Sequence, residues 1–450
     1  NPEPMRIFLA LLLSLLSAFS FAQLPKGDRI LAFQVDMAED GDYDAAFSFA
    51  QEACMEAIHF FITWDVLEPN EGEFDEQILD ELLSLANIYY SAFGTKVELQ
   101  LAPVNTNVLT VPEDLQSTSF ASAQMIDRFK TVLDTVFSRM PDVELAALNI
   151  GNESDIYFGV EQQQYVAYQT FLEAVRPYAQ SKYMALHGKA LKVGTTFTHH
   201  ALVDNQKASL CQMVNSNMDI IAVTYYPLNS DFTMQSTSVV AEDFDQLVDQ
   251  YSNTEQPIYF VECGYASSSI CNSSEDQQAD FFSEVFKAWD EHANRIQYLT
   301  IFKSTDWSQE EVDNFELYYG ISDLRFKEYL RTLGLRTYAG SGMNKLAYER
   351  LLCELESRGF CATACRTTTV QNDLMNEQIN IFPNPVADHL FIQYPAPQIN
   401  RLTLYDAQAH LLYATSKSNS LAMDNLAGGI YWLEIITDRG KILVEKIIKK

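Results

Sequence analysis

The segment ELAALNI at residues 144–150 is followed by Gly151, Asn152 and Glu153, and it sets the pattern for most of the chain. It is a short apolar run that ends at a turn residue and then at polar side chains. Such a run is typical of a strand buried on both faces of a parallel sheet. Seven further runs of this kind occur, at residues 30–35, 57–62, 96–101, 191–196, 219–225, 257–261 and 296–302.

Longer stretches with the apolar spacing of amphipathic helices separate these runs. They lie at residues 75–92, 123–140, 161–179, 239–251, 274–293 and 345–357. Strands that alternate with helices predict a parallel sheet covered on both faces, and eight such units predict a (β/α)8 barrel. A doubly wound open sheet is the alternative. No Gly-x-Gly-x-x-Gly turn follows any of the runs, which weakens that alternative.

Two carboxylates stand directly after predicted strands of this barrel. Glu153 follows the fourth strand, and Glu262 follows the seventh in the sequence YFVECG. Catalytic groups of barrel enzymes lie at the carboxyl ends of the strands. Two carboxyl groups that converge there suit glycoside hydrolysis, in which one donates a proton and the other attacks the anomeric carbon. The alternative is that both glutamates form loop salt bridges.

The Asn152-Glu153 pair after strand four, with Glu262 after strand seven, resembles glycoside hydrolase clan A. This resemblance implies a retaining (β/α)8 enzyme with Glu153 as acid/base, Glu262 as nucleophile and Asn152 as donor to the sugar 2-hydroxyl. Clan members often carry His-x-Tyr at the end of strand six, where this chain has Thr224 and Tyr226. The resemblance implies that Tyr226 hydrogen-bonds the nucleophile.

Further substrate-binding residues follow from the same resemblance. Trp64, in the phrase TWDVLEP after strand two, is expected to line the sugar cleft. Trp307 after strand eight is expected to form a stacking floor. Lys303 and Asp306 beside it are candidates to contact hydroxyls. An arginine near strand two, which many clan families carry, is absent from this sequence. The phrase GNE together with TYYP is also similar to the arabinogalactan endo-β-1,4-galactanases.

Other polar residues follow the predicted strands and are candidates for the cleft wall. We expect Asp36 after strand one and Asn105 after strand three to contact substrate. The remaining candidates are Asn107, His199 and His200. Neither the scattered histidines nor the cysteine spacing resembles a zinc site, and we predict neither a metal nor a cofactor.

A second module closes the chain after a polar linker at residues 366–377. Residues 378–450 contain short alternating strands separated by turns, which predicts a small all-β sandwich. The motifs FPNP at 382–385, LYD at 404–406 and LAGGIY at 426–431, with a basic final strand, resemble the type A sorting domain of the type IX secretion system. That resemblance implies a source in Bacteroidota, type IX machinery as a partner, and a secreted or surface-attached protein.

The N-terminal residues 5–22 have the pattern of a secretory signal peptide: Arg6, an apolar run and small residues before the expected cleavage site. The main barrel is then expected at residues 23–365. Seven cysteines suit an oxidising compartment. Cys263 and Cys271 are close enough in sequence for a local disulfide, and Cys353, Cys361 and Cys365 cluster near the end of the barrel.

Composition limits the possible partners. The 450 residues include 61 Asp and Glu against 30 Lys and Arg, a formal net charge of −31. So acidic a chain repels phosphate backbones and anionic lipid surfaces, which argues against nucleic-acid and membrane-surface binding. We expect a monomer that acts on a carbohydrate as a retaining β-glycosidase. A non-catalytic carbohydrate-binding protein on a decayed barrel is the alternative, and a Schiff-base barrel enzyme is disfavoured because no strand interior carries a lysine.

Overall fold

The computed structural model describes residues 25–360 and 380–450, apart from 394–398, 407–410, 417 and 438–441. Chain contacts divide the protein into two compact units, residues 1–365 and 366–450. The predicted signal peptide at 5–22 and the linker at 366–377 lie outside the described residues. Within the described part of the chain, no helix combines the length and apolarity that a membrane crossing requires.

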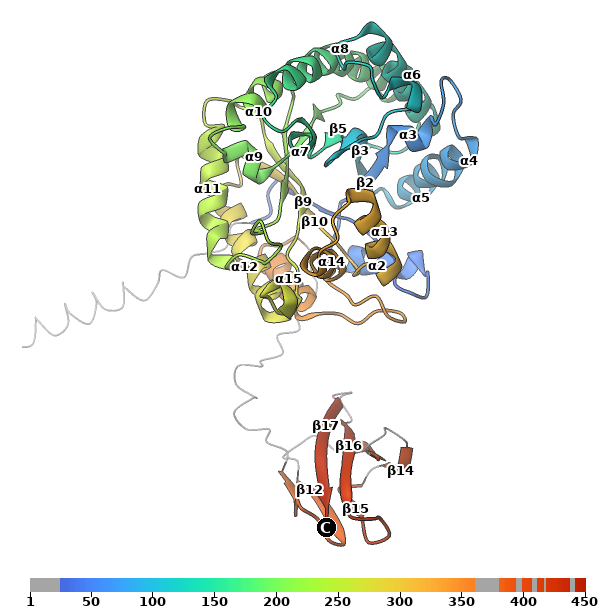
Figure 1. Ribbon diagram of the computed structural model, residues 1–450, viewed down its shortest axis with the longest axis vertical. Helices are drawn as coiled ribbons and strands as arrows, with labels where there is room; N and C mark the ends of the chain where they lie inside the picture. Colours follow the sequence, from blue (N-terminus) through green and yellow to red (C-terminus); the bar gives the residue numbers. More distant parts are fainter. Residues whose placement is uncertain (1–24, 361–379, 394–398, 407–410, 417, 438–441) are drawn as a thin grey trace, which may run out of the picture. The chain divides into compact units, whose positions relative to one another are not determined.

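The larger unit is a nearly closed barrel of parallel strands, as predicted (Figure 1). The order around the sheet is β6-β5-β3-β2-β1-β10-β9-β8-β7. Because β6 and β7 are separated only by Thr195, they act as two halves of one fifth strand and bring the two ends of the sheet together. The strands are β1 (Ile30–Phe33), β2 (Ala57–Thr63), β3 (Lys96–Asn105), β5 (Leu145–Asn152), β6 (Val193–Gly194), β7 (Thr196–Thr198), β8 (Ile221–Tyr225), β9 (Ile258–Cys263) and β10 (Ile296–Ile301).

Helices surround this barrel and bury the outer face of its strands (Figure 1). Serine or aspartate side chains cap several of them; Ser122 accepts from Met125, and Ser274 from Gln277. The principal helices are α2 (Tyr43–Glu52), η1 (Leu79–Ser84), α5 (Leu85–Phe93), α6 (Ala123–Arg139), α8 (Gln162–His187), α10 (Ala208–Asn215), α11 (Val240–Gln250), α12 (Glu275–Glu291) and α15 (Leu346–Ser357). Short helices α3 (Trp64–Leu67), α4 (Glu76–Ile78), α7 (Ser154–Phe158) and α9 (His199–Val203) follow strand ends or join helices.

The barrel interior contains a layer of mostly small side chains, and two stacked tyrosines fill the remaining space. Tyr259 and Tyr298 lie with ring centroids 4.9 Å apart. Around them pack buried alanines from the other strands: Ala32, Ala57, Ala147 and Ala222. Every second residue of a strand faces inward, so His59 and Phe61 follow Ala57 toward the mouth on β2. This packed layer fills the interior of the barrel, so the site forms beyond it, at the carboxyl ends of the strands.

The segment after β10 contains two helices that the predicted strand–helix repeat does not include. It contains α13 (Gln309–Tyr319), which begins with a capping box at Ser308 and Glu311, and α14 (Leu324–Arg331). In chain order both helices come between β10 and α15, and Figure 1 labels them. Their aromatic residues reach the mouth of the barrel, as described below.

The smaller unit is a β-sandwich, as predicted. Strands β11 (Asn380–Phe382), β12 (His389–Gln393) and β15 (Ser420–Ala422) form one antiparallel sheet. The second sheet, in the order β14-β13-β16-β17, contains β13 (Ile399–Tyr405), β14 (Leu411–Ser416), β16 (Gly429–Thr437) and β17 (Ile442–Lys449). Leu390 and Leu421 from the first sheet share one buried cluster with Leu404 and Leu433 from the second. The alternating pattern of these strands is what places one face of each in this core.

The cysteines do not pair as expected. Cys263 and Cys271 are both buried and free, so the predicted local disulfide is wrong. Cys263 lies at the end of β9 in the packed core, and the Cys271 thiol donates to the backbone oxygen of Arg325 at 3.4 Å. Cys211 is a third buried free thiol, whereas Cys54 and Cys353 are disulfide-bonded.

Gly151, directly before the first candidate residues, occupies a position that no other residue fits. Its φ is +84°, and a Cβ placed there would lie 2.3 Å from the Tyr168 hydroxyl, which is itself bonded to the Ile150 carbonyl. We predict that Gly151→Ala lowers the free energy of unfolding by about 1–2 kcal/mol for the backbone and by roughly 1–3 kcal/mol more for the clash. Gly188→Ala is the control, because Gly188 also has a positive φ (+65°), in the left-handed helical region, but open space around it. Equal losses in denaturant unfolding would contradict the packing argument.

Candidate active site

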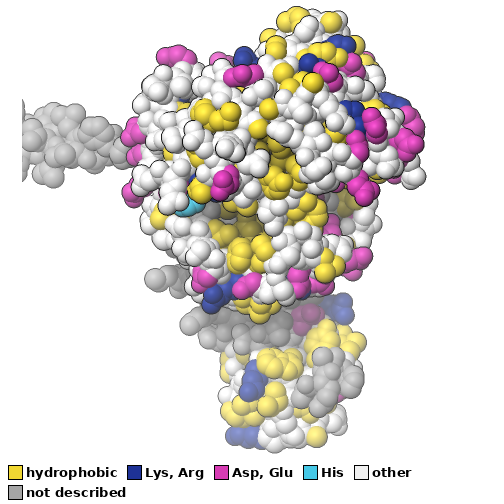
Figure 2. Space-filling model, turned by 45° about the horizontal axis from the view of Figure 1, so that its top comes forward, with side chains coloured by type: hydrophobic (Ala, Val, Ile, Leu, Met, Phe, Trp, Pro, Cys, Tyr) yellow, Lys and Arg dark blue, Asp and Glu magenta, His cyan; other side chains and the backbone are white. Residues whose placement is uncertain are grey.

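A single cavity of about 1340 Å³ opens at the carboxyl ends of the barrel strands. Figure 2 shows the hollow on this face of the larger unit, with hydrophobic side chains gathered around it. Seven of the eight site residues expected from the sequence line this cavity: Asp36, Asn105, Asn152, Glu153, Tyr226, Glu262 and Trp307. The strand-end positions thus converge as the barrel fold predicts.

Glu153 stands at the point where β5 ends and α7 begins. Its backbone is left-handed, with φ 45° and ψ 40°, a conformation that non-glycine residues adopt rarely and that recurs at functional sites. Both carboxylate oxygens are held: Oε2 accepts from the Thr106 hydroxyl at 3.0 Å, and Oε1 accepts from the Thr224 hydroxyl at 2.7 Å. These two threonines, on opposite sides of Glu153, fix the direction in which its carboxyl group points.

Glu262 is the penultimate residue of β9 and is only 7% exposed. Its Oε2 accepts a 2.6 Å hydrogen bond from the Tyr226 hydroxyl. Its Oε1 lies 4.0 Å from Nε2 of His59 on β2. The contact between Tyr226 and Glu262 is the one that the resemblance to clan A implied.

The pairing of β8 with β9 brings the two glutamates into one site. Thr224 on β8 lies opposite Glu262 on β9 in the parallel register, and the Thr224 hydroxyl donates to Glu153. Two residues further on, Tyr226 donates to Glu262. Because Thr224 and Tyr226 are two residues apart, both side chains face the cavity. Each of them therefore holds one of the two carboxylates.

Burial governs the protonation of both glutamates. Burial raises the pKa of Glu262 to about 7; the charge of Glu153 acts in the same direction, while the His59 and Tyr226 contacts oppose it. Burial also raises the pKa of Glu153, although the threonine hydroxyls oppose the shift. Like charges in one site disfavour the state in which both carboxyl groups are ionised.

A buried polar chain below Glu262 was not anticipated from the sequence. His59 Nδ1 lies 2.5 Å from Glu98 on β3, and Glu98 also accepts from Asn149 of β5 at 2.6 Å. Burial lowers the pKa of His59, but the charges of Glu98, Glu262 and Asp36 raise it overall. The inward position of His59 within a predicted strand was a usable signal, whereas its pairing with Glu98 required the barrel register.

Asn152 and Asn105 form a second pair at the ends of neighbouring strands. The Asn152 amide donates to the Asn105 side-chain oxygen at 3.1 Å, and the Asn105 amide donates to the Tyr318 hydroxyl at 3.1 Å. Both asparagines are buried and line the cavity. This chain links the ends of β3 and β5 to helix α13.

Trp307 lies in the cavity wall after β10, with the Lys303 ammonium 3.6 Å from its ring centroid. The same ammonium lies 3.3 Å from Asp36 Oδ2. Burial lowers the pKa of Lys303 to about 8, while Asp36 opposes the shift. Lys303 is fully buried behind these two residues, so it positions the tryptophan and the carboxylate instead of facing the cavity as we had expected.

Trp64 does not line the cavity, which corrects one sequence expectation. It is fully buried at the start of α3, where its indole N–H donates to Glu68 at 2.8 Å and its ring packs edge-on against Phe129 of α6. Asp306 is likewise structural, because it accepts from the Lys345 ammonium at 2.7 Å and from the backbone of Gly334. Both residues follow strand ends, but their loops turn outward into the helical layer.

Two tyrosines from the segment after β10 complete the site. Tyr319 of α13 and Tyr329 of α14 line the cavity, and both glutamates raise the pKa of each tyrosine in addition to the effect of burial. The Tyr329 ring also packs edge-on against Tyr226, with centroids 5.8 Å apart. No strand-end rule places these residues in the site, because they come from helices beyond the last strand.

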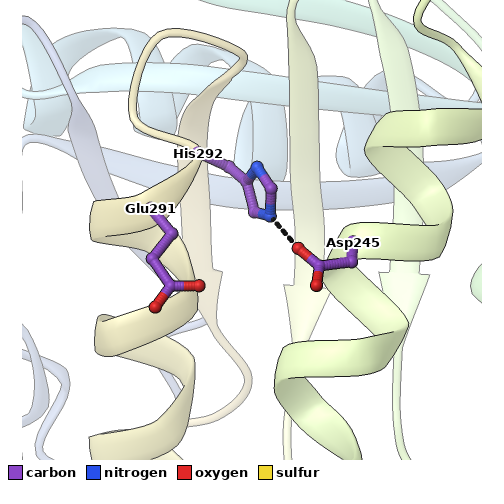
Figure 3. Close-up of side chains that lie close together, drawn as sticks. All are labelled: Asp245, Glu291 and His292. Carbon is purple, nitrogen blue, oxygen red and sulfur yellow. Dashed lines mark hydrogen bonds and ion pairs between the residues drawn. The ribbon is translucent and has the colours of Figure 1, made fainter.

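The remaining cavity candidates are peripheral. Asn107, His199 and His200 line the cavity, and His199 Nε2 lies 2.9 Å from the backbone oxygen of Asp243. Among the described residues, the one cluster with metal-ligand spacing is Asp245, Glu291 and His292, on α11 and at the end of α12 (Figure 3). Its His292–Asp245 contact of 2.7 Å is a surface ion pair outside the cavity.

Comparisons with known proteins support the fold of each unit. The barrel resembles GH5_18 from Bifidobacterium longum subsp. longum ATCC 55813 (TM-score 0.56, 14% identity, 75% of this chain and 80% of that chain). It also resembles GH5_18 from Streptomyces cattleya in complex with GlcNAc (0.58, 14%, 75% and 81%) and the exo-beta-1,4-mannosidase Op5Man5 from Opitutaceae bacterium strain TAV5 (0.53, 14%, 75% and 62%). At this identity the likeness shows the fold alone.

Residues 380–450 match the family model described as a secretion system C-terminal sorting domain. This match agrees with the sandwich seen in the smaller unit and supports export of the protein, to the cell surface or into the medium. A search of curated protein sequences finds no match to this chain.

The raised pKa of Glu262 predicts how stability depends on pH. The folded protein holds this proton up to about pH 7, whereas an ordinary glutamate loses it near 4.5. Stability therefore falls as pH rises between these values. We expect Glu262→Gln to stabilise the protein above pH 7 by up to about 3 kcal/mol, and to lose this advantage toward pH 4.5. Thermal unfolding across this range, with exposed Glu255→Gln as control, tests the prediction; a pH-independent gain would contradict it.

Proposed function

We propose that the protein is a retaining glycoside hydrolase that cleaves a β-glycosidic bond by double displacement. The observation that carries the proposal is the pair of glutamates at the cavity, each held by a hydroxyl from the carboxyl end of β8: Thr224, within the strand, on Glu153 and Tyr226, directly after it, on Glu262. Paired carboxylates with separate partners at the mouth of a barrel fit the chemistry of glycoside cleavage.

In this proposal Glu262 is the nucleophile. Burial raises its pKa to about 7, so it is ionised above that pH. Two contacts favour the ionised form: the Tyr226 hydroxyl donates to it, and the His59 ring, held by Glu98, lies 4.0 Å from its other oxygen. A carboxylate so held keeps one oxygen oriented for attack on the anomeric carbon. His59 acts as a positioning residue, because its contact is with Glu262.

Glu153 is then the acid/base. Its threonine partners are hydroxyls, which both donate and accept, so they accommodate a protonated carboxyl as well as a carboxylate. Burial raises its pKa, which keeps a proton available for the leaving oxygen. After the glycosyl–Glu262 ester forms, the deprotonated Glu153 takes a proton from water, and that water opens the ester with overall retention.

The two glutamates should respond differently to substitution. Glu262→Gln should lower turnover at least about a thousandfold, because no covalent intermediate forms. Glu153→Ala should slow turnover roughly 10²–10⁴-fold. Azide should restore it on a 4-nitrophenyl glycoside, since that leaving group needs no proton and azide replaces the activated water. The measurement is nitrophenol release together with the configuration of the glycosyl azide.

A suitable substrate is first identified by screening 4-nitrophenyl β-glycosides and plant and algal polysaccharides. Glu81→Gln is the control, because Glu81 lines the same cavity on η1 and is bonded to Gln77 instead of to the glutamate pair. It should keep wild-type turnover. If both glutamate variants also keep it, the protein is not a glycosidase of this kind, and the decayed, sugar-binding barrel becomes the better description.

We also propose that export uses both ends of the chain: the signal peptide at residues 5–22 and type IX machinery that recognises the sandwich. In a Bacteroidota host with type IX secretion, deletion of residues 380–450 should leave the barrel in the periplasm. Immunoblots of cell fractions against the barrel measure this. Undiminished appearance of the truncated protein at the surface or in the medium would contradict the proposal.

A further inference from the structure

Apart from three histidines, His59, His199 and His200, the charged side chains that line the cavity are acidic. Five acidic residues face it, and the cavity lining within the described residues includes neither lysine nor arginine. The acidic residues are Asp36, Glu81, Glu153, Asp243 and Glu262. Lys303 is fully buried and lies against Asp36 and Trp307. Of the lining histidines, His59 has a raised pKa, but its ring is already held between Glu98 and Glu262. A carboxylate or sulfate group on a substrate would therefore be desolvated next to like charges without a free cationic partner.

One flank of the same cavity is apolar and exposed. It is formed by Met37 after β1, Phe61 near the end of β2, Leu82 on η1, and Leu85 and Tyr89 on α5. Met37 is 46% exposed, Phe61 36%, Leu82 37% and Leu85 57%. We call these five residues the apolar flank. Figure 2 shows how hydrophobic side chains line the hollow. Exposed apolar surface inside a cavity usually marks what the cavity binds.

The chemistry of the apolar flank does not suit further sugar units. Each sugar hydroxyl that leaves water needs a hydrogen-bond partner, and the side chains of Met37, Leu82 and Leu85 offer none. Flat aromatic faces stack on sugar rings, but three of the five side chains here are aliphatic. Each methylene of an aliphatic group buried against them would instead contribute favourably.

We infer that the cavity binds an uncharged glycoside and that the apolar flank holds an aliphatic part of that substrate. This inference rests on the proposed function, because it names the substrate class of the same site. The flank and the glutamate pair line one continuous cavity, so a single ligand reaches both. The aliphatic group adds affinity, and the acidic lining rejects uronic acids and sulfated sugars.

Binding of n-alkyl β-glycosides to the full-length protein tests the inference. Titration calorimetry with butyl to octyl glucosides and galactosides, below their micelle concentrations, should show affinity that rises at least about tenfold across the series. The matching octyl glucuronide should bind at least about tenfold more weakly than the glucoside, because its charge is unpaired. The titrations use the full-length Glu262→Gln variant, which binds without turnover, so a chain-length effect supports the binding site independently of whether the wild-type protein hydrolyses the same glycosides.

Two matched variants locate the binding surface. Leu85→Asp should abolish the gain with chain length, whereas Ile88→Asp should retain it. Ile88 is 66% exposed on the same helix α5 but does not line the cavity, so both changes cost the helix about the same. The inference is overturned if affinity is independent of chain length or if the two variants behave alike. It also falls if the glucuronide binds as well as the glucoside, or if added sugar units produce the gain that Leu85→Asp removes.

Discussion

The site depends on the cost of holding two like charges in one buried cavity. Burial raises the pKa of both Glu153 and Glu262, and the charge of Glu153 adds to the shift at Glu262. The side chains that contact the two carboxylates differ. A histidine and a phenol face Glu262, while two aliphatic hydroxyls face Glu153. The β8–β9 register imposes this asymmetry, because it sets Thr224 opposite Glu262.

Periodicity predicted the barrel and the convergence of its strand ends, because a parallel sheet places all carboxyl ends on one face. That rule located Glu153 and Glu262, and the period of two located Tyr226 beside Thr224. These inferences needed only local sequence and one general property of the fold. The all-β sandwich could also be predicted from the sequence, since its strands alternate apolar and polar residues.

The failures have a common physical cause: they depend on where a loop goes after a strand ends. Trp64 and Asp306 follow strand ends, yet their loops carry them into the helical layer. Tyr319 and Tyr329 reach the site from helices that no strand-end rule includes. The His59–Glu98 contact joins neighbouring strands, so it became visible only with the register of β2 and β3. The disulfide expected at Cys263 and Cys271 failed because both thiols are packed inside the fold.

Those buried thiols constrain the order of events when the protein matures. Burial raises the pKa of the Cys271 thiol to about 11, so in the folded barrel it is both inaccessible and protonated. Cys211 and Cys263 are also free and fully buried, so solvent does not reach their thiols. In an unfolded chain all three would be open to oxidation, and a wrong pairing would prevent β9 from entering the sheet. Folding of the barrel before oxidation would protect these three thiols and leave Cys54 and Cys353, which are disulfide-bonded, free to react. Packing, and not cysteine spacing, selects which thiols remain reduced.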